Sequence, residues 1–120
     1  MENNKLLETI LQTLDNKKAI DLDAIRIDDI TVLTDYFVIC TGTSTTHVKT
    51  LADEVEVKVK EALDIDPAHR DGYDGGKWVL LDYSDVMVHV FCEEYREFYK
   101  LERLWADGKQ VDVSSYLKED

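Results

Sequence analysis

The sequence lacks the features that mark membrane and secreted proteins. No stretch of its 120 residues approaches the roughly 18 uncharged apolar residues that a membrane-spanning helix needs. The opening residues Met1–Lys5 lack the apolar core of a secretory signal. These two absences predict a cytoplasmic protein. With 44% hydrophobic and 33% charged residues, the chain has the size and composition of one compact domain.

Cysteine is scarce as well. Cys40 and Cys92 are the only two cysteines, and each lies within a run of apolar, strand-like residues. A thiol in such a run usually behaves as a small buried hydrophobe. Neither cysteine has a Cys or His neighbour at the close spacing of a metal site. We expect two reduced core thiols, with a structural disulfide or a metal pair as the alternatives.

Basic residues are few relative to acidic ones. The chain has 14 Lys and Arg against 26 Asp and Glu, which gives a formal net charge of -12. Binding nucleic acid requires clustered basic side chains, because each contact neutralises a phosphate. Here the basic residues are scattered and matched by acidic neighbours, such as Glu54 with Lys58. Nucleic acid is therefore not expected as a direct partner, and the acidic surface serves either solubility alone or steering toward a basic partner.

Hydrophobic periodicity in the first half predicts two helices and two strands. Leu6, Leu7, Ile10, Leu11 and Leu14 recur at helical spacing. Farther along, a second apolar stripe follows the same spacing: Val48, Leu51, Ala52, Val55, Val59, Ala62 and Leu63. The predicted elements are a helix from a cap at Asn3 or Asn4 to about Asn16, a half-buried strand at Ala19–Ile27, a central strand at Tyr36–Cys40, and the longest helix at residues 44–63.

The second half predicts a hairpin and a short helix. His69–Lys77 is rich in Gly and Asp and is typical of a loop. Strands are predicted at Trp78–Leu81 and Val86–Cys92, antiparallel because the short link cannot hold a crossover. A short helix over residues 98–105 and a polar C-terminal tail over 106–120 follow. The pattern predicts an α/β domain over residues 1–105, with a mixed sheet and flanking helices.

Catalytic and metal motifs are incomplete. Thr41–Ser44 joins a strand to a helix, and backbone N–H groups at such a helix N-terminus could bind an anion. The segment lacks the P-loop and dinucleotide-binding patterns. It suits a tight turn in which Thr43 or Ser44 caps the helix. A metal-dependent nucleotidyltransferase would pair such a turn with acidic residues, of which Asp82 and Asp85 are the nearest. They flank a hairpin turn instead of forming an acidic pair on the adjacent strand. No two of the three histidines share ligand spacing, so we expect no metal, no cofactor and no catalytic residue.

Aromatic side chains are the more informative feature. Trp78 begins a strand beside a polar loop, where a half-exposed indole would make an interface anchor. His89 alternates with Val88 and Val90, so it should point away from their shared face, where it could hydrogen-bond across strands; a metal or general-base role is the alternative. Core packing suits Phe91, Phe98 and Trp105.

Four blocks follow one another along the chain: Thr34–Ser44 (TDYFVICTGTS), Trp78–Tyr83 (WVLLDY), Val88–Phe91 (VHVF) and Arg96–Trp105 (REFYKLERLW). In this order they resemble the ribosomal silencing factor family, RsfS, also called Iojap. The resemblance covers about residues 5–105. One departure is Asp71-Gly72, where family members usually carry Glu-Gly; the shorter side chain keeps the charge but not the reach.

The resemblance implies a nucleotidyltransferase-like α/β fold without the catalytic acidic pair. It implies a non-enzymatic factor that binds ribosomal protein fourteen of the large ribosomal subunit, blocks subunit joining and represses translation when nutrients are scarce. The binding surface would comprise Trp78, Asp82, His89, Arg96, Tyr99, Glu102 and Trp105.

The net charge agrees with this partner, because bare RNA repels an acidic domain and a basic ribosomal protein attracts it. Two alternatives remain open. One is a nucleotidyltransferase that uses Thr43, Ser44, Asp82 and Asp85. The other is a homodimeric structural module, and a silencing factor could also form a homodimer when off the ribosome.

Overall fold

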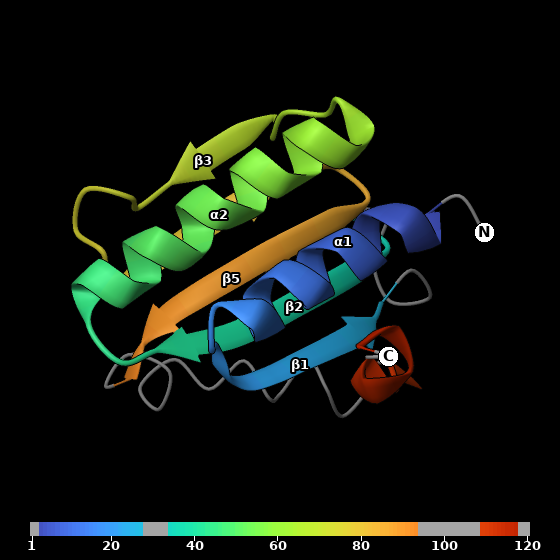
Figure 1. Cartoon of the computed structure of the whole chain (residues 1–120), viewed down its shortest axis with the longest axis horizontal. Helices are drawn as coiled ribbons and strands as arrows, with labels where there is room; N and C mark the ends of the chain where they lie inside the picture. Colours follow the sequence, from blue (N-terminus) through green and yellow to red (C-terminus); the bar gives the residue numbers. More distant parts are fainter. Residues whose placement is uncertain (1–2, 28–33, 94–108, 118–120) are drawn as a thin grey trace.

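The computed structural model describes residues 3–27, 34–93 and 109–117 of the chain. They form one layer of two helices packed on one face of a six-stranded sheet (Figure 1). In chain order the elements are α1 (Asn3–Asn16), β1 (Ile20–Arg26), β2 (Tyr36–Gly42), α2 (Thr45–Leu63), β3 (His69–Asp71), β4 (Trp78–Asp82), β5 (Val86–Cys92), β6 (Lys109–Gln110) and the 3-10 helix η1 (Val113–Tyr116).

The sheet is mixed, as predicted, with the strand order β3-β4-β5-β2-β1-β6. β2 and β5 run parallel over their whole lengths, from Tyr36 opposite Val86 to Gly42 opposite Cys92. The other strand pairs are antiparallel, including the predicted hairpin of β4 and β5. The crossover between the two parallel strands carries α2, which is why the long helix lies directly over the sheet.

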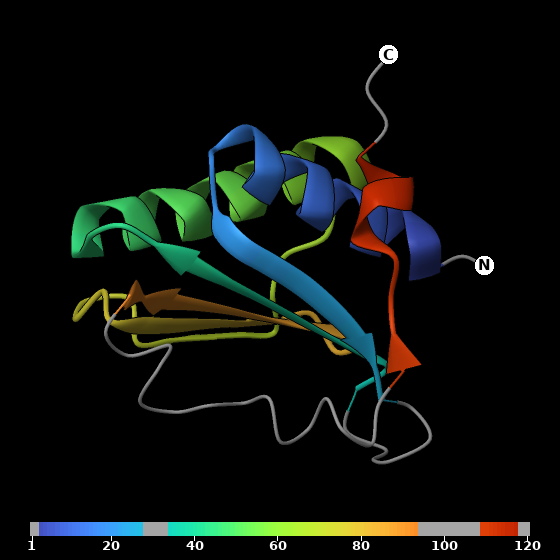
Figure 2. The same cartoon turned by 90° about the horizontal axis from the view of Figure 1, so that it is seen from below.

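Both helices cover the same face of the sheet (Figure 2). The apolar stripe predicted for α1 is buried there: Leu6, Leu7, Ile10, Leu11 and Leu14. The stripe predicted for α2 is buried over Val48, Leu51, Ala52, Val55 and Val59. Its last two members differ from the prediction, since in the last turn of the helix Ala62 is exposed and Leu63 is only partly buried. They pack against inward side chains of β2, β4 and β5, such as Val38, Val79 and Val88. Most of the buried apolar side chains that the structure describes belong to this helix-side core.

A second apolar cluster lies on the sheet face opposite the helices. Its buried members are Ile25, Ile27, Ile39 and Phe91, with Phe37 and Trp78 packed against them. The alternation of side chains along β2 and β5 separates the two clusters, since successive residues of a strand point to opposite faces. β2 is therefore buried on both faces, as its apolar run predicts.

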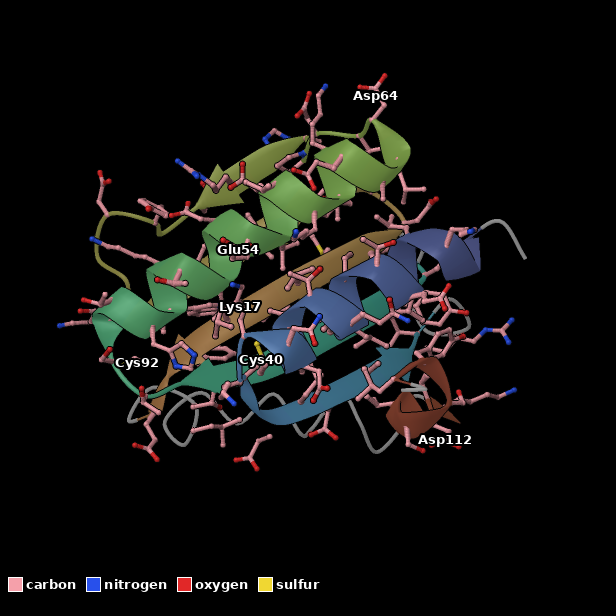
Figure 3. The ribbon with its side chains drawn as sticks, in the orientation of Figure 1. Lys17, Cys40, Glu54, Asp64, Cys92 and Asp112 are labelled. Carbon is pink, nitrogen blue, oxygen red and sulfur yellow. The ribbon has the colours of Figure 1, made fainter. Side chains whose placement is uncertain are left out.

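The two cysteines lie on neighbouring strands as free thiols (Figure 3). Cys40 is buried and Cys92 is partly buried, and both pack with the helix-side core. Cys40 is opposite Val90, whereas Cys92 is opposite Gly42, so the two thiols are offset by two residues along the paired strands.

Two short elements differ from the sequence prediction. β3 falls within the predicted loop His69–Lys77; its three residues are all exposed, so no apolar alternation reveals it. β6 and η1 fall within the predicted polar tail, where β6 pairs with β1 and Tyr116 packs against the helix-side core. A strand of two residues and a helix of four are too short to show periodicity. The helix predicted at 98–105 lies outside the described residues.

Candidate functional site: an aromatic cluster opposite the helices

Four ring-bearing side chains form an aromatic cluster on the sheet face opposite the helices: Phe37, Trp78, His89 and Phe91. The strand registers bring them together, because Trp78 is opposite Phe91 in the β4–β5 hairpin and His89 is opposite Ile39 in the parallel pair. Val88 and Val90 lie in the helix-side core. The predicted orientation of His89, away from the face of these two valines, is confirmed.

The rings are in direct contact. Trp78 stacks on Phe91 with a centroid distance of 4.9 Å, and Phe37 packs on His89 at 4.7 Å in a tilted arrangement. The indole Nε1–H of Trp78 donates a hydrogen bond of 3.1 Å to Nδ1 of His89. The cross-strand hydrogen bond predicted for His89 is therefore present, and it fixes the relative orientation of the two rings.

His89 is uncharged at neutral pH. Its side chain is only 6% exposed, and burial lowers its pKa to about 4, because water no longer solvates the imidazolium. Indole is a donor only, so Nδ1 of His89 must accept and the ring proton must sit on Nε2. Nε2 is buried and has no hydrogen-bond partner among the described residues. Such an unsatisfied donor costs about 1–3 kcal/mol.

Trp78 lies at the boundary between the sheet and the loop before it. Its side chain is partly buried, which agrees with the half-exposed indole predicted from the sequence. Gly72 lies against its backbone at a positive φ of 80°, where an added Cβ would come 2.1 Å from the carbonyl oxygen of Trp78. Only glycine fits there. The Asp71-Gly72 dipeptide thus allows the loop to turn back against the start of β4.

Asp82 lies at the other end of β4 from Trp78. Its carboxylate Oδ1 accepts the backbone N–H of Ser84 at 2.8 Å, closing a turn in which Ser84 has a φ of 74°. Alternation along β4 puts Asp82 on the same face as Trp78, about 13 Å farther along the strand. The structure therefore brings Trp78 and His89 together and leaves Asp82 outside their contact. The predicted Arg96, Tyr99, Glu102 and Trp105 lie outside the described residues.

Sequence reasoning missed Phe37, which contacts His89. Leu80 and Met87, both partly buried, also share this face through the β4–β5 register. Tyr36–Cys40 is a continuous apolar run, so the sequence alone does not assign its residues to faces. The signal that could have found Phe37 is the parallel register, which aligns it with Met87, two residues before His89.

The residues that a nucleotidyltransferase would need are at opposite ends of the sheet. Asp82 is opposite Met87, which is opposite Phe37 near the start of β2, whereas Thr43 and Ser44 follow the end of β2. Six residues of extended chain separate the two ends, or about 20 Å. Ser44 instead caps α2, with its hydroxyl accepting the N–H of His47 at 3.1 Å. Within residues 3–27, 34–93 and 109–117, no three His, Cys, Asp or Glu side chains are grouped to hold a metal.

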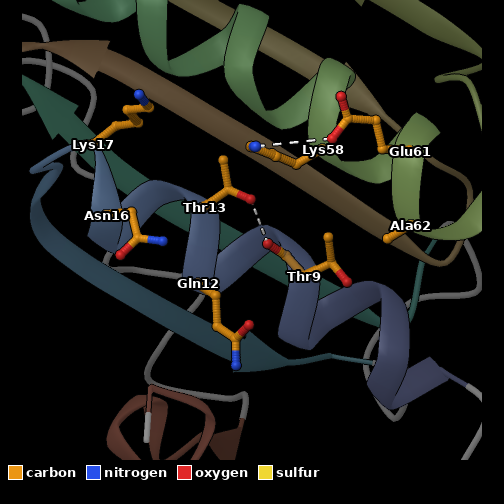
Figure 4. A pocket seen from close by; sticks show the side chains of 8 residues that line it. All are labelled: Thr9, Gln12, Thr13, Asn16, Lys17, Lys58, Glu61 and Ala62. Carbon is orange, nitrogen blue, oxygen red and sulfur yellow. Dashed lines mark hydrogen bonds and ion pairs between the residues drawn. The ribbon is translucent and has the colours of Figure 1, made fainter. Parts of the chain in front are cut away.

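A polar groove of about 620 Å³ lies between α1 and α2 (Figure 4). Its hydroxyl donors are already used, because Thr13 donates to the carbonyl of Thr9 at 2.7 Å and Thr9 donates to that of Lys5 at 2.9 Å. Lys58 pairs with Glu61 at 3.8 Å. Hence the groove holds no convergent set of free donors, and the aromatic cluster remains the stronger candidate.

Charged side chains dominate the outer surface of α2. Lys17, just after the end of α1, contacts Glu54 at 4.0 Å (Figure 3). Arg70 of β3 contacts Glu56 at 2.8 Å. Tyr73 donates to Asp53 at 2.8 Å and lies under the guanidinium of Arg70. These exposed pairs connect neighbouring elements, and each contributes little to stability because solvent screens them.

No described helix is long and apolar enough to cross a membrane.

Comparison with known proteins identifies close relatives. The family model described as "Ribosomal silencing factor during starvation" (RsfS) matches residues 1–120. A ribosomal silencing factor RsfS of Halalkalibacterium halodurans is 36% identical over 117 residues, covering 98% of this chain and 99% of that protein. The mouse protein "Mitochondrial assembly of ribosomal large subunit protein 1" is 32% identical over 102 residues, covering 82% of this chain and 44% of its own length. A crystal structure of a Chromobacterium violaceum protein is 35% identical and superposes with a TM-score of 0.83, covering 88% of each chain.

Proposed function

This chain belongs to the RsfS family of ribosomal silencing factors, and we propose that it acts by binding the large ribosomal subunit and blocking its joining to the small subunit. The observation that carries the proposal is the aromatic cluster with Trp78 at its accessible side. A half-buried tryptophan held by a stacking partner and a hydrogen bond is pre-organised as an interface anchor. The name of the mouse relative, which refers to the ribosomal large subunit, supports the choice of subunit.

The proposed contact on that subunit is ribosomal protein fourteen. Its recognition would combine the aromatic cluster with the acidic surface of the chain, whose net charge is -12. Such a charge repels RNA phosphates and attracts a basic protein, which favours a protein component of the ribosome. Asp71 and Asp82 are on the same sheet face as Trp78, where they suit the polar rim of an interface.

The remaining proposed contacts rest on the family resemblance. Arg96, Tyr99, Glu102 and Trp105 belong to the last block of the resemblance, Arg96–Trp105, which follows β5 in the sequence. We include them in the proposed surface for this reason. Cytoplasmic action and self-association into a homodimer away from the ribosome are proposed on the same basis.

A role without catalysis is part of the proposal. The observation in its favour is the separation of Thr43 and Ser44 from Asp82 by the length of β2. Two-metal phosphoryl transfer needs its ligands within a few ångströms of one another. Asp82 and Ser44 have local structural functions instead, in closing the hairpin turn and capping α2.

Sedimentation tests the proposed function. We expect the purified chain to co-sediment with large subunits in a sucrose gradient and to lower the yield of joined ribosomes when both subunits are mixed. Lys58→Ala, in the groove between the helices, is a matched control that should behave as the wild type. The proposal is wrong if saturating wild-type protein leaves the joined-ribosome peak unchanged and none of it travels with large subunits.

A further inference from the structure

His89 carries a donor for which the described part of the chain provides no acceptor. Trp78 donates to Nδ1, so the only proton of the neutral imidazole is on Nε2. Nε2 is buried, and no described residue accepts its proton. Buried N–H groups are almost always hydrogen-bonded, so an unsatisfied one needs a physical reason.

The described neighbours of His89 do not supply an acceptor. Phe37 and Phe91 present rings to it, and the residues opposite it on the adjacent strands are Ile39 and Leu80. None of these side chains carries oxygen or nitrogen, and the sheet uses the backbone groups of these paired strands. The described surroundings thus offer no hydrogen-bond acceptor to Nε2, while the hydrogen bond from Trp78 keeps the proton on Nε2.

The donor lies just beneath a partly accessible apolar surface. Phe37, Trp78, Leu80 and Met87 share the face of His89, and each is partly rather than fully buried. This is the surface on which Trp78 would act as an anchor. A partner seated there would cover His89 further, which raises the cost of leaving Nε2 without an acceptor.

We infer that the Trp78–His89 pair selects a partner that places an oxygen acceptor against Nε2 of His89. This inference rests on the proposed function and adds to it what the partner must offer. The acceptor is a backbone carbonyl, hydroxyl or carboxylate oxygen of a protein segment that displaces the rings around His89 slightly. A lysine or arginine side chain at this point is rejected, because it has no acceptor and would face another donor. Basic residues of the partner belong at the acidic rim instead.

Two substitutions separate this role from core packing. His89→Leu removes the donor, whereas His89→Gln keeps an acceptor for Trp78 and a donor for the partner. His89→Leu removes an unsatisfied buried donor but also the acceptor of the Trp78 indole N–H. Since these two effects oppose each other, we expect its melting temperature to stay close to that of the wild type. Its binding to large subunits should weaken by about 10- to 100-fold, and His89→Gln should restore most of it.

These experiments distinguish failure of the proposed function from failure of the inference about His89. If wild-type protein fails to bind large subunits, the proposed function fails. If the wild type and His89→Leu bind equally well, the function stands and this inference fails. Should His89→Leu not fold, nuclear magnetic resonance of the wild type decides: the Nε2–H signal should move downfield and exchange more slowly when purified ribosomal protein fourteen is added. A bound state with an unchanged Nε2–H signal overturns the inference.

Discussion

Trp78→Ala distinguishes binding from folding most directly. The substitution removes a stack on Phe91, worth about 0.5–1.5 kcal/mol, and a hydrogen bond to His89 of similar size. Since the indole is only partly buried, we expect a loss of about 2 kcal/mol in the free energy of unfolding. That is below the roughly 3–5 kcal/mol of a fully buried aromatic side chain. The melting temperature should fall by roughly 10 °C and the domain should stay folded.

Binding to the large subunit should fall more than stability explains. Loss of a central aromatic anchor costs about 2 kcal/mol or more, or about a 30-fold increase in Kd. At 20 °C the variant remains almost entirely folded, so unfolding contributes little to this increase. Co-sedimentation over a range of protein concentrations, with thermal unfolding followed on the same sample, gives both numbers.

Val59→Ala is the matched control for Trp78→Ala. Val59 belongs to α2 and is fully buried in the helix-side core, on the opposite side of the sheet from Trp78. Its truncation to alanine should also lower the free energy of unfolding by about 2 kcal/mol. The two variants should therefore unfold at similar temperatures, and only Trp78→Ala should bind weakly. If both lose binding equally, or if Trp78→Ala binds as well as the wild type, Trp78 is not an interface anchor.

Three further predictions concern His89, Ser44 and Gly72. The pKa of His89 in the folded chain, about 4, is below the ordinary value of 6.5, so between these two pH values the unfolded chain binds a proton that the folded chain does not. Stability should therefore be unaffected above pH 6.5 and fall by about 3 kcal/mol toward pH 4. Denaturant titrations should show a smaller fall in His89→Gln. Ser44→Ala removes the cap of α2 and should cost about 1 kcal/mol in urea unfolding, with large-subunit binding unchanged. Gly72→Ala puts a Cβ against the carbonyl of Trp78 and should lower both the melting temperature and large-subunit binding. Gly75→Ala should change neither, because its Cβ would make only an ordinary contact of 4.0 Å with the carbonyl oxygen of Gly72.

The sequence predicts the elements that are long and amphipathic. The spacing of the apolar stripes identified the buried residues of α1 and α2 correctly, except in the last turn of α2, where Ala62 is exposed and Leu63 is only partly buried. The hairpin of β4 and β5 was predictable because a short link allows only antiparallel pairing. The parallel pairing of β2 with β5 was not, since it depends on where α2 packs and not on any local pattern.

The candidate site was predicted in part. Trp78 and His89 could be singled out because one begins a strand after a polar loop and the other interrupts a row of valines. Their mutual hydrogen bond requires the register of β4 against β5, in which His89 is opposite Leu80 and diagonal to Trp78. A shift of one residue would put the two rings on opposite faces. Asp82 was assigned to the binding surface because it lies in a sequence block of the family resemblance. Its carboxylate instead accepts the backbone N–H of Ser84, a local role that the block does not reveal.

The distribution of buried residues explains how the domain tolerates an unsatisfied donor at His89. The helix-side core contains nineteen of the described buried apolar residues, whereas the cluster on the opposite face contains four. Folding therefore depends mainly on the contact of α1 and α2 with the sheet. The opposite face can hold Trp78 partly exposed and Nε2 of His89 unpaired at a cost of about 1–3 kcal/mol, which the helix-side core offsets. Substitutions on the helix side should consequently act on stability, and those around Trp78 and His89 should act mainly on binding.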